Sequence, residues 1–251
     1  MPEIIYKPRP APLQNLQLFE KLYDTCKNTP FYLPHWGCFH GVAGYGKTTA
    51  AGHVRASNNC VLIECGSTWA AGTLVDALCS ELLIRPKGGV SNRVQQIIRV
   101  LADNPVPMVF DEADHLVKKS LIDVIREIAD KTQAPVIFIG EQMMPDKLKQ
   151  FERAYSRVGH WARSVPCSMG DARLLVKSVF GKDGVAVSDD LLVKLLNEAE
   201  GSTRRLAAKL YDGAQVAKAK GLKSLTIENY RGEARFGEPN TRFEKWRQVS
   251  V

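Results

Sequence analysis

Two kinds of hydrophobic pattern alternate along the first two thirds of the chain. Short, nearly continuous apolar runs occupy residues 36–40, 60–65, 107–112 and 134–140. Runs of this length are typical of strands buried on both faces of a parallel sheet. Between them lie segments with apolar residues every three or four positions, at 48–55, 73–83, 92–102 and 116–129, which predict helices. Strands that alternate with helices predict an α/β fold with a parallel sheet.

The two ends of the chain differ from this middle part. Residues 1–12 are rich in proline and predict an extended arm, and residues 13–26 have a helical period. After Pro166 no strand-like apolar run remains, and helices are predicted at 168–180, 188–199, 202–220 and 226–235. Ser168 and Asp171 have the spacing of a capping box at the start of the first of these. We therefore expect an N-terminal arm and helix (1–34), an α/β domain (35–167), a small all-helical domain (168–235) and a basic, aromatic tail (236–251).

Composition narrows the functional classes. The 251 residues carry a net charge of +7, which permits binding to nucleic acid without requiring it. Neither the six cysteines nor the five histidines have the spacing of metal ligands. The cysteines are scattered and several lie in apolar runs, so we expect free thiols and a cytoplasmic protein. No apolar stretch is long enough for a membrane span, and no membrane partner is expected.

The first chemical motif follows the first predicted strand. Residues 41–48 fit G-x-x-x-x-G-K-T, the phosphate-binding loop, and a predicted helix begins where the motif ends. Glycine allows the backbone amides to turn toward phosphate oxygens, lysine adds a positive charge, and the threonine hydroxyl can bind Mg²⁺. The pattern predicts an ATP and Mg²⁺ site with these residues: Gly41, Val42, Ala43, Gly44, Tyr45, Gly46, Lys47, Thr48 and Thr49.

A second motif ends the third predicted strand, at Asp111 and Glu112. Ligands of open α/β sheets bind at the carboxyl ends of the strands, so both carboxylates are expected near the phosphate loop. Asp111 is suited to hold Mg²⁺ together with Thr48, and Glu112 to polarise the attacking water. Lys47, Glu112 and a charge-stabilising arginine would then form the catalytic set of an ATP hydrolase.

Two arginines are candidates for contact with the γ-phosphate. Arg157 precedes the helical domain and is our candidate for an arginine that acts on a neighbouring subunit, with Arg153 and Arg163 as competitors. Arg204 opens a predicted helix, where basic residues are disfavoured unless an anion is nearby.

With these residues in place, the chain resembles the AAA+ ATPases. Residues 41–48 match their Walker A motif, Asp111 and Glu112 Walker B, Arg157 the arginine finger and residues 201–204 sensor 2. The resemblance implies a three-layer α/β P-loop fold with a helical lid, and a polar sensor after the fourth strand. Glu141 or Gln142 stands at that point, where the family usually has Asn or Thr.

Within that family, the segments Phe-Asp-Glu-Ala-Asp-His-Leu, Ile-Gly-Glu and Tyr-Ser-Arg-Val resemble the transposition target selectors of the MuB, TnsC and TniB type. This resemblance implies an ATP-dependent, non-sequence-specific binder of double-stranded DNA. Such proteins form homo-oligomeric filaments on DNA and deliver it to a transposase, and a phage-encoded member would act in the host cytoplasm. Because only a short segment precedes the core, we expect DNA contacts from the ATPase core itself.

Several basic or aromatic positions that we expect at the surface are candidates for those contacts, and each is also compatible with an ordinary solvated or packed side chain. They are Trp69, Lys87, Arg93, Lys118 and Lys119. In the tail, Arg242, Lys245, Trp246 and Arg247 are suited to dock a partner or DNA.

Three alternatives share the same core. A replication loader or initiator would use ATP on DNA, and a nucleotide-gated interaction module would bind ATP with little turnover. A P-loop kinase needs an acceptor pocket and an arginine-rich lid within one subunit, which the predicted helical C-terminal domain disfavours.

Overall fold

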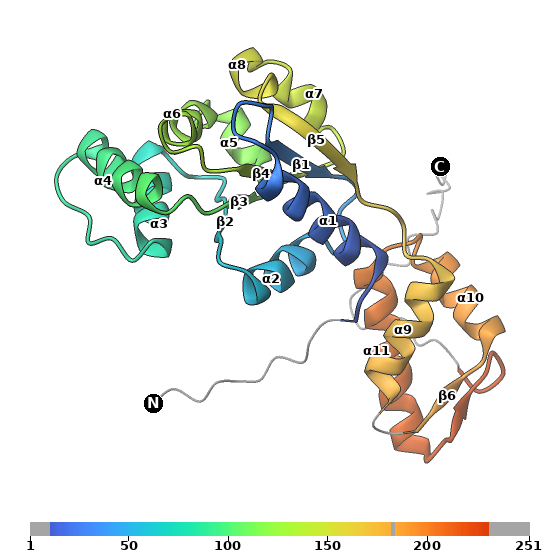
Figure 1. Cartoon of the computed structure of the whole chain (residues 1–251). Coiled ribbons are helices and arrows are strands. Elements are labelled where there is room, and N and C mark those ends of the chain that lie inside the picture. The colour runs from blue at the N-terminus through green and yellow to red at the C-terminus, as the bar shows by residue number, and fades with distance from the viewer. Residues whose placement is uncertain (1–10, 182–183, 231–251) are drawn as a thin grey trace, which may run out of the picture.

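A parallel sheet forms the centre of the computed structural model, which describes residues 11–181 and 184–230 (Figure 1). The five strands have the order β2-β3-β4-β1-β5, and every neighbouring pair is parallel. In chain order they are β1 (Trp36–His40), β2 (Val61–Glu64), β3 (Met108–Asp111), β4 (Val136–Gly140) and β5 (Val158–Arg163). The predicted α/β class with a parallel sheet is therefore confirmed.

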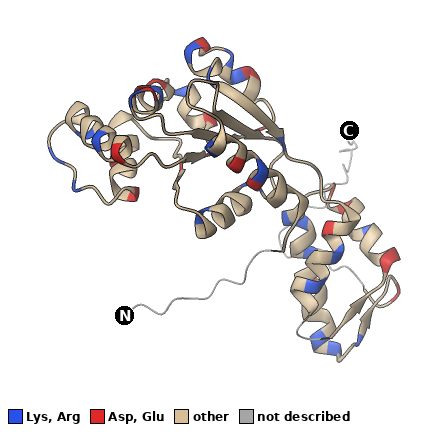
Figure 2. Ribbon diagram, in the orientation of Figure 1, with Lys and Arg blue, Asp and Glu red and all other residues tan. Residues whose placement is uncertain are grey.

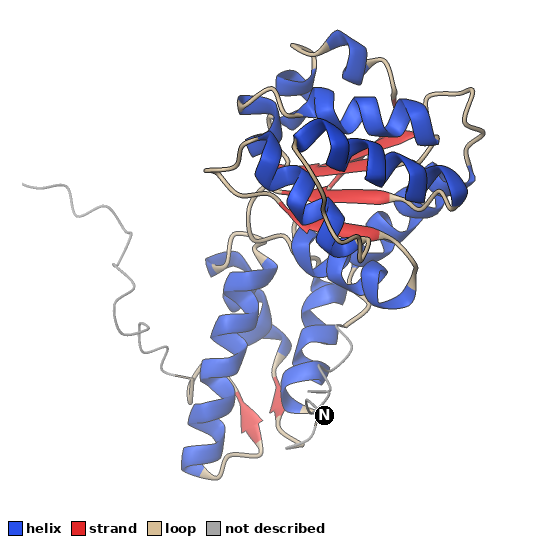
Figure 3. Ribbon diagram, turned by 90° about the vertical axis from the view of Figure 1, so that its left-hand side faces the viewer, coloured by secondary structure: helices blue, strands red, loops and turns tan. Residues whose placement is uncertain are grey.

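Helices cover both faces of the sheet, which gives three layers (Figure 3). Successive strand residues point to opposite faces. Phe110 and Phe138 thus join the core on one face, and Val109 and Ile137 the core on the other. The second face is covered by α1 (Gln14–Asn28) and α2 (Lys47–Ser57). The first is covered by α3 (Ala71–Glu81), α4 (Val90–Asp103), α5 (Asp114–Lys118), α6 (Ile122–Thr132), α7 (Met144–Leu148) and α8 (Glu152–Tyr155).

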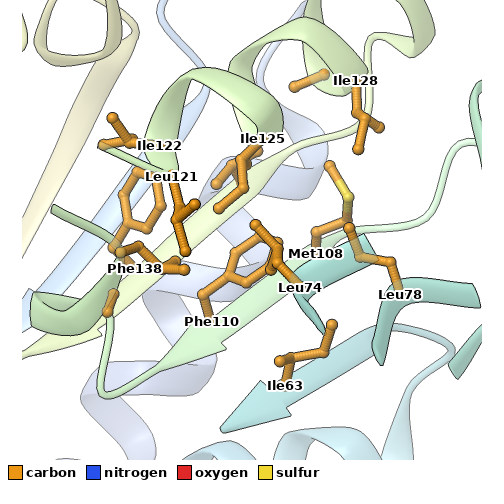
Figure 4. Close-up of a cluster of buried hydrophobic side chains, with 14 of the residues drawn as sticks. Ile63, Leu74, Leu78, Met108, Phe110, Leu121, Ile122, Ile125, Ile128 and Phe138 are labelled. Carbon is orange, nitrogen blue, oxygen red and sulfur yellow. The ribbon is translucent and has the colours of Figure 1, made fainter. Parts of the chain in front are cut away.

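The larger core holds β3 in place. Met108 and Phe110 of β3 lie among Leu74 and Leu78 from α3 and Ile125 from α6, and none of these five side chains is exposed (Figure 4). Burial of each such side chain stabilises the fold by about 1.5–3 kcal/mol. Packing of this kind fixes the carboxyl end of β3, where the two acids of the second motif stand.

The structure differs from the sequence-based expectation at two places in the sheet domain. The predicted helix over 116–129 is two helices, because Ser120 takes a left-handed backbone conformation (φ +54°) and separates α5 from α6. Strand β5 was not predicted. It lies at the edge of the sheet, where only Val158 of its six residues is buried, so its sequence lacks a continuous apolar run.

The C-terminal part has a core of its own, to which Leu13 of the N-terminal segment also packs. Its helices are α9 (Met169–Phe180), α10 (Asp189–Glu198) and α11 (Thr203–Lys220), all three close to their predicted positions. The prediction that this part is entirely helical is wrong, because β6 (Ala186–Val187) and β7 (Ser224–Leu225) form a short parallel pair. The helix predicted from Thr226 is also absent from the described residues, where 227–229 form one turn, and residues 231–235 lie outside them.

Two sequence expectations fall outside the part described. The extended arm, residues 1–10, and the tail at 236–251 are not covered. Among the residues that are, no helix has the length and apolar content needed to cross a membrane, and no cluster of three His, Cys, Asp or Glu side chains suits a metal. All six cysteines are free thiols and all are buried.

Candidate functional site

The two predicted motifs meet at one cavity. It lies at the carboxyl ends of β1, β3 and β4 and has a volume of about 410 Å³. Residues 43–49 of the phosphate loop line it, as do Asp111, Glu112 and Glu141. Strand order explains the meeting, since β1 pairs with β4 and β4 with β3, so their carboxyl ends share one edge. The parallel topology therefore brings together two motifs that lie far apart in the sequence.

The loop owes its shape to glycines in left-handed or related conformations. Gly41, Gly44 and Gly46 have φ values of +148°, +83° and +85°. A side chain at Gly44 would also meet the Ser202 hydroxyl, whose oxygen would lie 2.5 Å from the added Cβ. Gly46 is the residue before α2, so the positive end of that helix faces the cavity. Such a loop is suited to bind phosphate oxygens.

Lys47 folds back over its own loop. Its ammonium group donates hydrogen bonds to the carbonyls of Gly41 (2.8 Å) and Val42 (3.0 Å). Burial lowers the pKa of Lys47, and the carboxylates of Asp111 and Glu112 oppose that effect. Gly41 and Val42, both predicted to bind the nucleotide, do not line the cavity and instead supply the carbonyls that hold this lysine.

The two carboxylates at the end of β3 have different environments. Asp111 is 4% exposed and accepts a hydrogen bond from the Glu112 backbone N–H (2.9 Å). Partial removal from water raises the pKa of the Glu112 carboxyl, and the charge of Asp111 raises it further. Glu112 is also in a left-handed conformation, with φ +52°. A carboxylate with a raised pKa is a better proton acceptor, as a general base requires.

Sequence reasoning missed a third acid, Asp114. It is 3% exposed and forms an ion pair with the Lys147 ammonium group. It also accepts a hydrogen bond from the Glu141 N–H (2.8 Å), and the Glu141 carboxylate pairs with Lys147 (3.0 Å). Asp114 thus fixes the position of the predicted sensor Glu141. The signal available in the sequence was its place in the same acidic turn as Asp111 and Glu112.

The C-terminal helical part reaches the phosphate loop through the start of α11. The Arg204 backbone N–H donates to the Gly44 carbonyl (3.0 Å), and the Ser202 hydroxyl lies 3.4 Å from the same oxygen. Arg204 lines the cavity and its side chain is exposed, and within the described part of the chain no ion pair involves it. The guanidinium is therefore available to an anion in the cavity, and its contact with the γ-phosphate stays a prediction.

Arg157 lies at the amino ends of the strands, opposite the cavity. Its carbonyl accepts a hydrogen bond from the N–H of Trp36, the first residue of β1, whereas the phosphate loop follows the last. The guanidinium makes two hydrogen bonds to Asp130, at 2.6 and 2.8 Å, and also contacts the Arg153 carbonyl. From this place Arg157 cannot serve the cavity of its own chain, so a catalytic role requires a second subunit.

The candidate DNA contacts fall into two groups. Lysines and arginines occur on both parts of the molecule (Figure 2), and Lys87, Lys118 and Lys119 are exposed. Arg93 instead forms an ion pair with Asp76, and only 17% of its side chain is exposed. Trp69 is partly buried against the larger core, and its indole lies over Gly66. The geometry therefore favours the three lysines over Arg93 and Trp69.

Sequence reasoning also missed the contribution of α1. Asn15 and Leu16 of α1 line the cavity together with the preceding residue Leu13, and so do Leu175 of α9 and Ala207 of α11. Their apolar atoms suit the face of a nucleotide base, while the loop and acids suit its phosphates. The predicted helix at 13–26 carried no polar motif that would have pointed to this role.

Comparison with known proteins agrees with this geometry. Residues 34–148 match a family model described as an AAA domain. No curated protein matches the chain. Among solved structures, the chain is similar to the Aeropyrum pernix ORC1 protein in complex with DNA (TM-score 0.64, 15% identity), Cdc6p from Pyrobaculum aerophilum (0.63, 20%) and the Aeropyrum pernix ORC2 protein in its ADPNP–ADP complexes (0.58, 13%).

These alignments cover most of this chain but less of the others. They span 90%, 92% and 77% of this chain, and 66%, 68% and 59% of ORC1, Cdc6p and ORC2. The aligned part of the chain thus spans about two thirds of the length of these proteins, or less, and at such identities the likeness shows the fold alone. The fold therefore matches that of AAA+ P-loop ATPase structures, and residues 34–148 match the AAA domain model. The similar structures named above include ORC and Cdc6 proteins, and the resemblance to the MuB, TnsC and TniB type stays a prediction.

Proposed function

We propose that the protein is an ATP hydrolase that binds double-stranded DNA without sequence specificity and oligomerises on it to deliver target DNA to a transposase. One observation carries the nucleotide chemistry, namely that the phosphate loop, Asp111, Glu112 and Arg204 all line one cavity. Assembly on DNA and transposition rest on the sequence resemblance to the MuB, TnsC and TniB type.

The residues of the cavity have separate roles in hydrolysis. Glu112 accepts a proton from the attacking water, and Lys47 leaves its loop carbonyls to pair with phosphate oxygens. Arg204 and Glu141 contact the end of the triphosphate, where Arg204 attracts the γ-phosphate and Glu141 orients water. Arg157 of a neighbouring subunit completes the charge stabilisation.

Thr48 and Asp111 fit a magnesium ion. Both line the cavity, and a hydroxyl with a carboxylate is an oxygen donor set that Mg²⁺ accepts. The ion would neutralise charge on the phosphates. The base would lie against Leu16, Leu175 and Ala207, which face the apolar side of the same cavity.

DNA binding is supported by the exposed lysines 87, 118 and 119 and by the net charge of +7. Repetition of a few phosphate contacts in each subunit multiplies their effect along a duplex. Hydrolysis would then disassemble the oligomer. Dependence of turnover on DNA and on assembly follows, because each site needs an arginine from its neighbour.

Electron microscopy with ATP and plain duplex DNA tests this proposal. Filaments that lengthen with the DNA support the target-selector function, and loss of ATP should remove them. DNA affinity should fall steeply with salt, because contacts to phosphate release counterions. Absence of any DNA-dependent assembly would contradict the proposal.

A second candidate is an AAA+ loader or initiator of DNA replication. The similarity to ORC1 and Cdc6p favours it. In the same experiment it predicts isolated closed rings or short arcs whose size does not follow DNA length. A nucleotide-gated interaction module, the third possibility, predicts ATP binding with negligible turnover in every condition.

A further inference from the structure

Asn15 is a buried amide in the wall of the cavity. It stands in the first turn of α1 and is 6% exposed. Its Nδ2 donates to the carbonyls of Tyr45 (2.8 Å) and Val165 (2.7 Å), and its Oδ1 accepts from the Val165 N–H (2.8 Å). One side chain therefore joins three segments, which are α1, the phosphate loop and the linker between β5 and α9.

The bond to Tyr45 orients a peptide of the phosphate loop. In a trans peptide the carbonyl and the following N–H point in opposite directions, and no cis peptide occurs in the described residues. When Asn15 holds the Tyr45 carbonyl on the outside of the loop, the Gly46 N–H is held facing the other way. Gly46 lines the cavity, so that N–H is one of the donors expected for phosphate.

The preceding peptide is held from the other side. The Gly44 carbonyl accepts from the Arg204 N–H, which orients the Tyr45 N–H in the same manner. Two consecutive peptides of the loop are thus fixed from outside, one by α1 and one by α11. Asn15 differs from Arg204 because it also holds both polar backbone atoms of Val165.

The start of α1 has further contacts with the C-terminal helical part. The Gln14 N–H donates to Asp171 in the first turn of α9 (2.9 Å), and Leu13 packs on the core of that part. The rest of α1 packs on the sheet. A movement of the loop at Tyr45 should therefore also move Asn15, and with it the segment between β5 and α9 that precedes the helical part.

We propose that Asn15 is a positioning residue of the nucleotide site, whose amide holds the Gly46 N–H in the orientation that binds phosphate. Through its bonds to Val165, the same amide links nucleotide binding in the loop to the segment between β5 and α9. The inference rests on the proposed nucleotide binding. Asn15 also lines the cavity, but both of its amide donors are engaged by Tyr45 and Val165, so its removal acts on binding affinity through the loop.

The Asn15→Asp variant tests the proposal with a fluorescent ADP analogue as the probe. Its carboxylate keeps the acceptor for the Val165 N–H but cannot donate to either carbonyl. We expect binding to weaken about tenfold at pH near 8, because a buried carbonyl loses its donor. Lower pH should restore part of the affinity relative to the parent, since the protonated acid can donate one hydrogen bond.

Asn28→Asp is the matched control, because it makes the same chemical change on an exposed residue of the same helix. Asn15→Ser removes the long amide without adding charge to the cavity wall and should weaken binding as well; loss of affinity in Asn15→Asp alone would show charge repulsion and overturn the inference. Thermal melts without nucleotide report folding separately. Parent-like affinity in a folded Asn15 variant, or an equal loss in the control, overturns the inference. Failure of the parent to bind the probe would instead contradict the proposed function.

Discussion

Glu112 combines two features that are unfavourable for the local stability of the fold. It has a left-handed backbone conformation, which is unfavourable for a residue with a side chain, and a pKa raised by partial burial and by Asp111. Both features are costly to the folded state. Both are found at a carboxylate that lines the cavity, as the proposed general base requires.

Replacement of Glu112 by Gln removes the proton acceptor and keeps the shape. We expect the ATPase rate to fall at least about 100-fold, while ATP binding remains. Phosphate release and a fluorescent nucleotide measure the two properties separately. Glu127→Gln, an exposed position on α6, is the control, and turnover at the parental rate in Glu112→Gln would show that Glu112 is not the base.

The same variant should alter the dependence of stability on pH. The folded state raises the Glu112 pKa, so the parent loses stability as pH rises from the ordinary carboxyl pKa through the raised one. The Gln variant has no such loss. Its melting temperature should match that of the parent near pH 4 and exceed it near pH 8. A constant difference at all pH values would contradict the proposed origin of the shift.

Sequence patterns singled out the cavity residues that belong to conventional motifs and missed those that bond distant backbone groups. The phosphate loop, Asp111, Glu112 and Arg204 were predicted, and the structure brings them to one cavity. Asn15 and Asp114 were not, because an amide or acid that bonds a distant backbone group leaves no spacing rule in the sequence. Only the folded chain brings Tyr45 and Val165 to Asn15.

Among the elements, α9 is tied to the rest of the molecule at its first turn. Ser168 and Asp171 form the predicted capping box, in which each side chain bonds the other residue's backbone N–H. Asp171 also accepts the Gln14 N–H from α1. A cap thus also serves as a contact between the two parts of the molecule.

Asp171→Ala should therefore be more harmful than loss of a surface charge. We expect a decrease of about 1–2 kcal/mol in the free energy of unfolding, since caps of this type contribute that amount. Asp189→Ala removes an exposed ion pair with Arg173 and should cost less than about 1 kcal/mol. Urea denaturation measures both, and equal effects would show that the cap is unimportant.

Prediction of strands succeeded where the apolar run is nearly continuous and failed where it is not. Four strands were found in this way, including β2 at one edge of the sheet. Strand β5 pairs with β1 on one side only, and its exposed residues resemble those of a loop. The break at Ser120 was missed for a related reason, since apolar periodicity continues across it while the backbone does not.

At the scale of the whole molecule, Arg157 and the cavity lie at opposite ends of the strands of one sheet. Head-to-tail contact between copies brings such ends together, and it can continue into an open filament instead of a closed ring. A site made this way is complete only in an assembly. Nucleotide turnover and association are then linked in both directions.

Mixing two inactive variants tests this arrangement. Lys47→Ala lacks phosphate binding and Arg157→Ala lacks the donated arginine, so each alone should have little ATPase activity. An equimolar mixture should recover activity in about a quarter of the sites if subunits assemble at random. Mixtures of either variant with itself provide the baseline, and no recovery would count against the cross-subunit role.

An exposed apolar loop next to Arg157 gives a second test of assembly. Phe31, Tyr32 and Leu33 are 59%, 74% and 48% exposed, and their loop approaches β5, since a Cβ on Gly159 would lie 2.1 Å from the Pro34 carbonyl oxygen. Replacement of Phe31 and Tyr32 by Ser should weaken ATP-dependent self-association at least about tenfold in sedimentation, with nucleotide binding by the monomer unchanged. Leu83→Ser, at a 93% exposed position, is the control, and equal weakening by both would show a nonspecific effect.

The burial of all six thiols has a practical consequence. Burial raises the pKa of Cys26 and Cys65 to about 12 and that of Cys167 to about 11, and it raises the pKa of Cys38, Cys60 and Cys79 too, so little thiolate forms at neutral pH. The folded protein should therefore react very slowly with alkylating dyes. One cysteine added to the surface would carry almost all of the label, and the slow modification of the six native cysteines would report the rate at which the fold opens spontaneously.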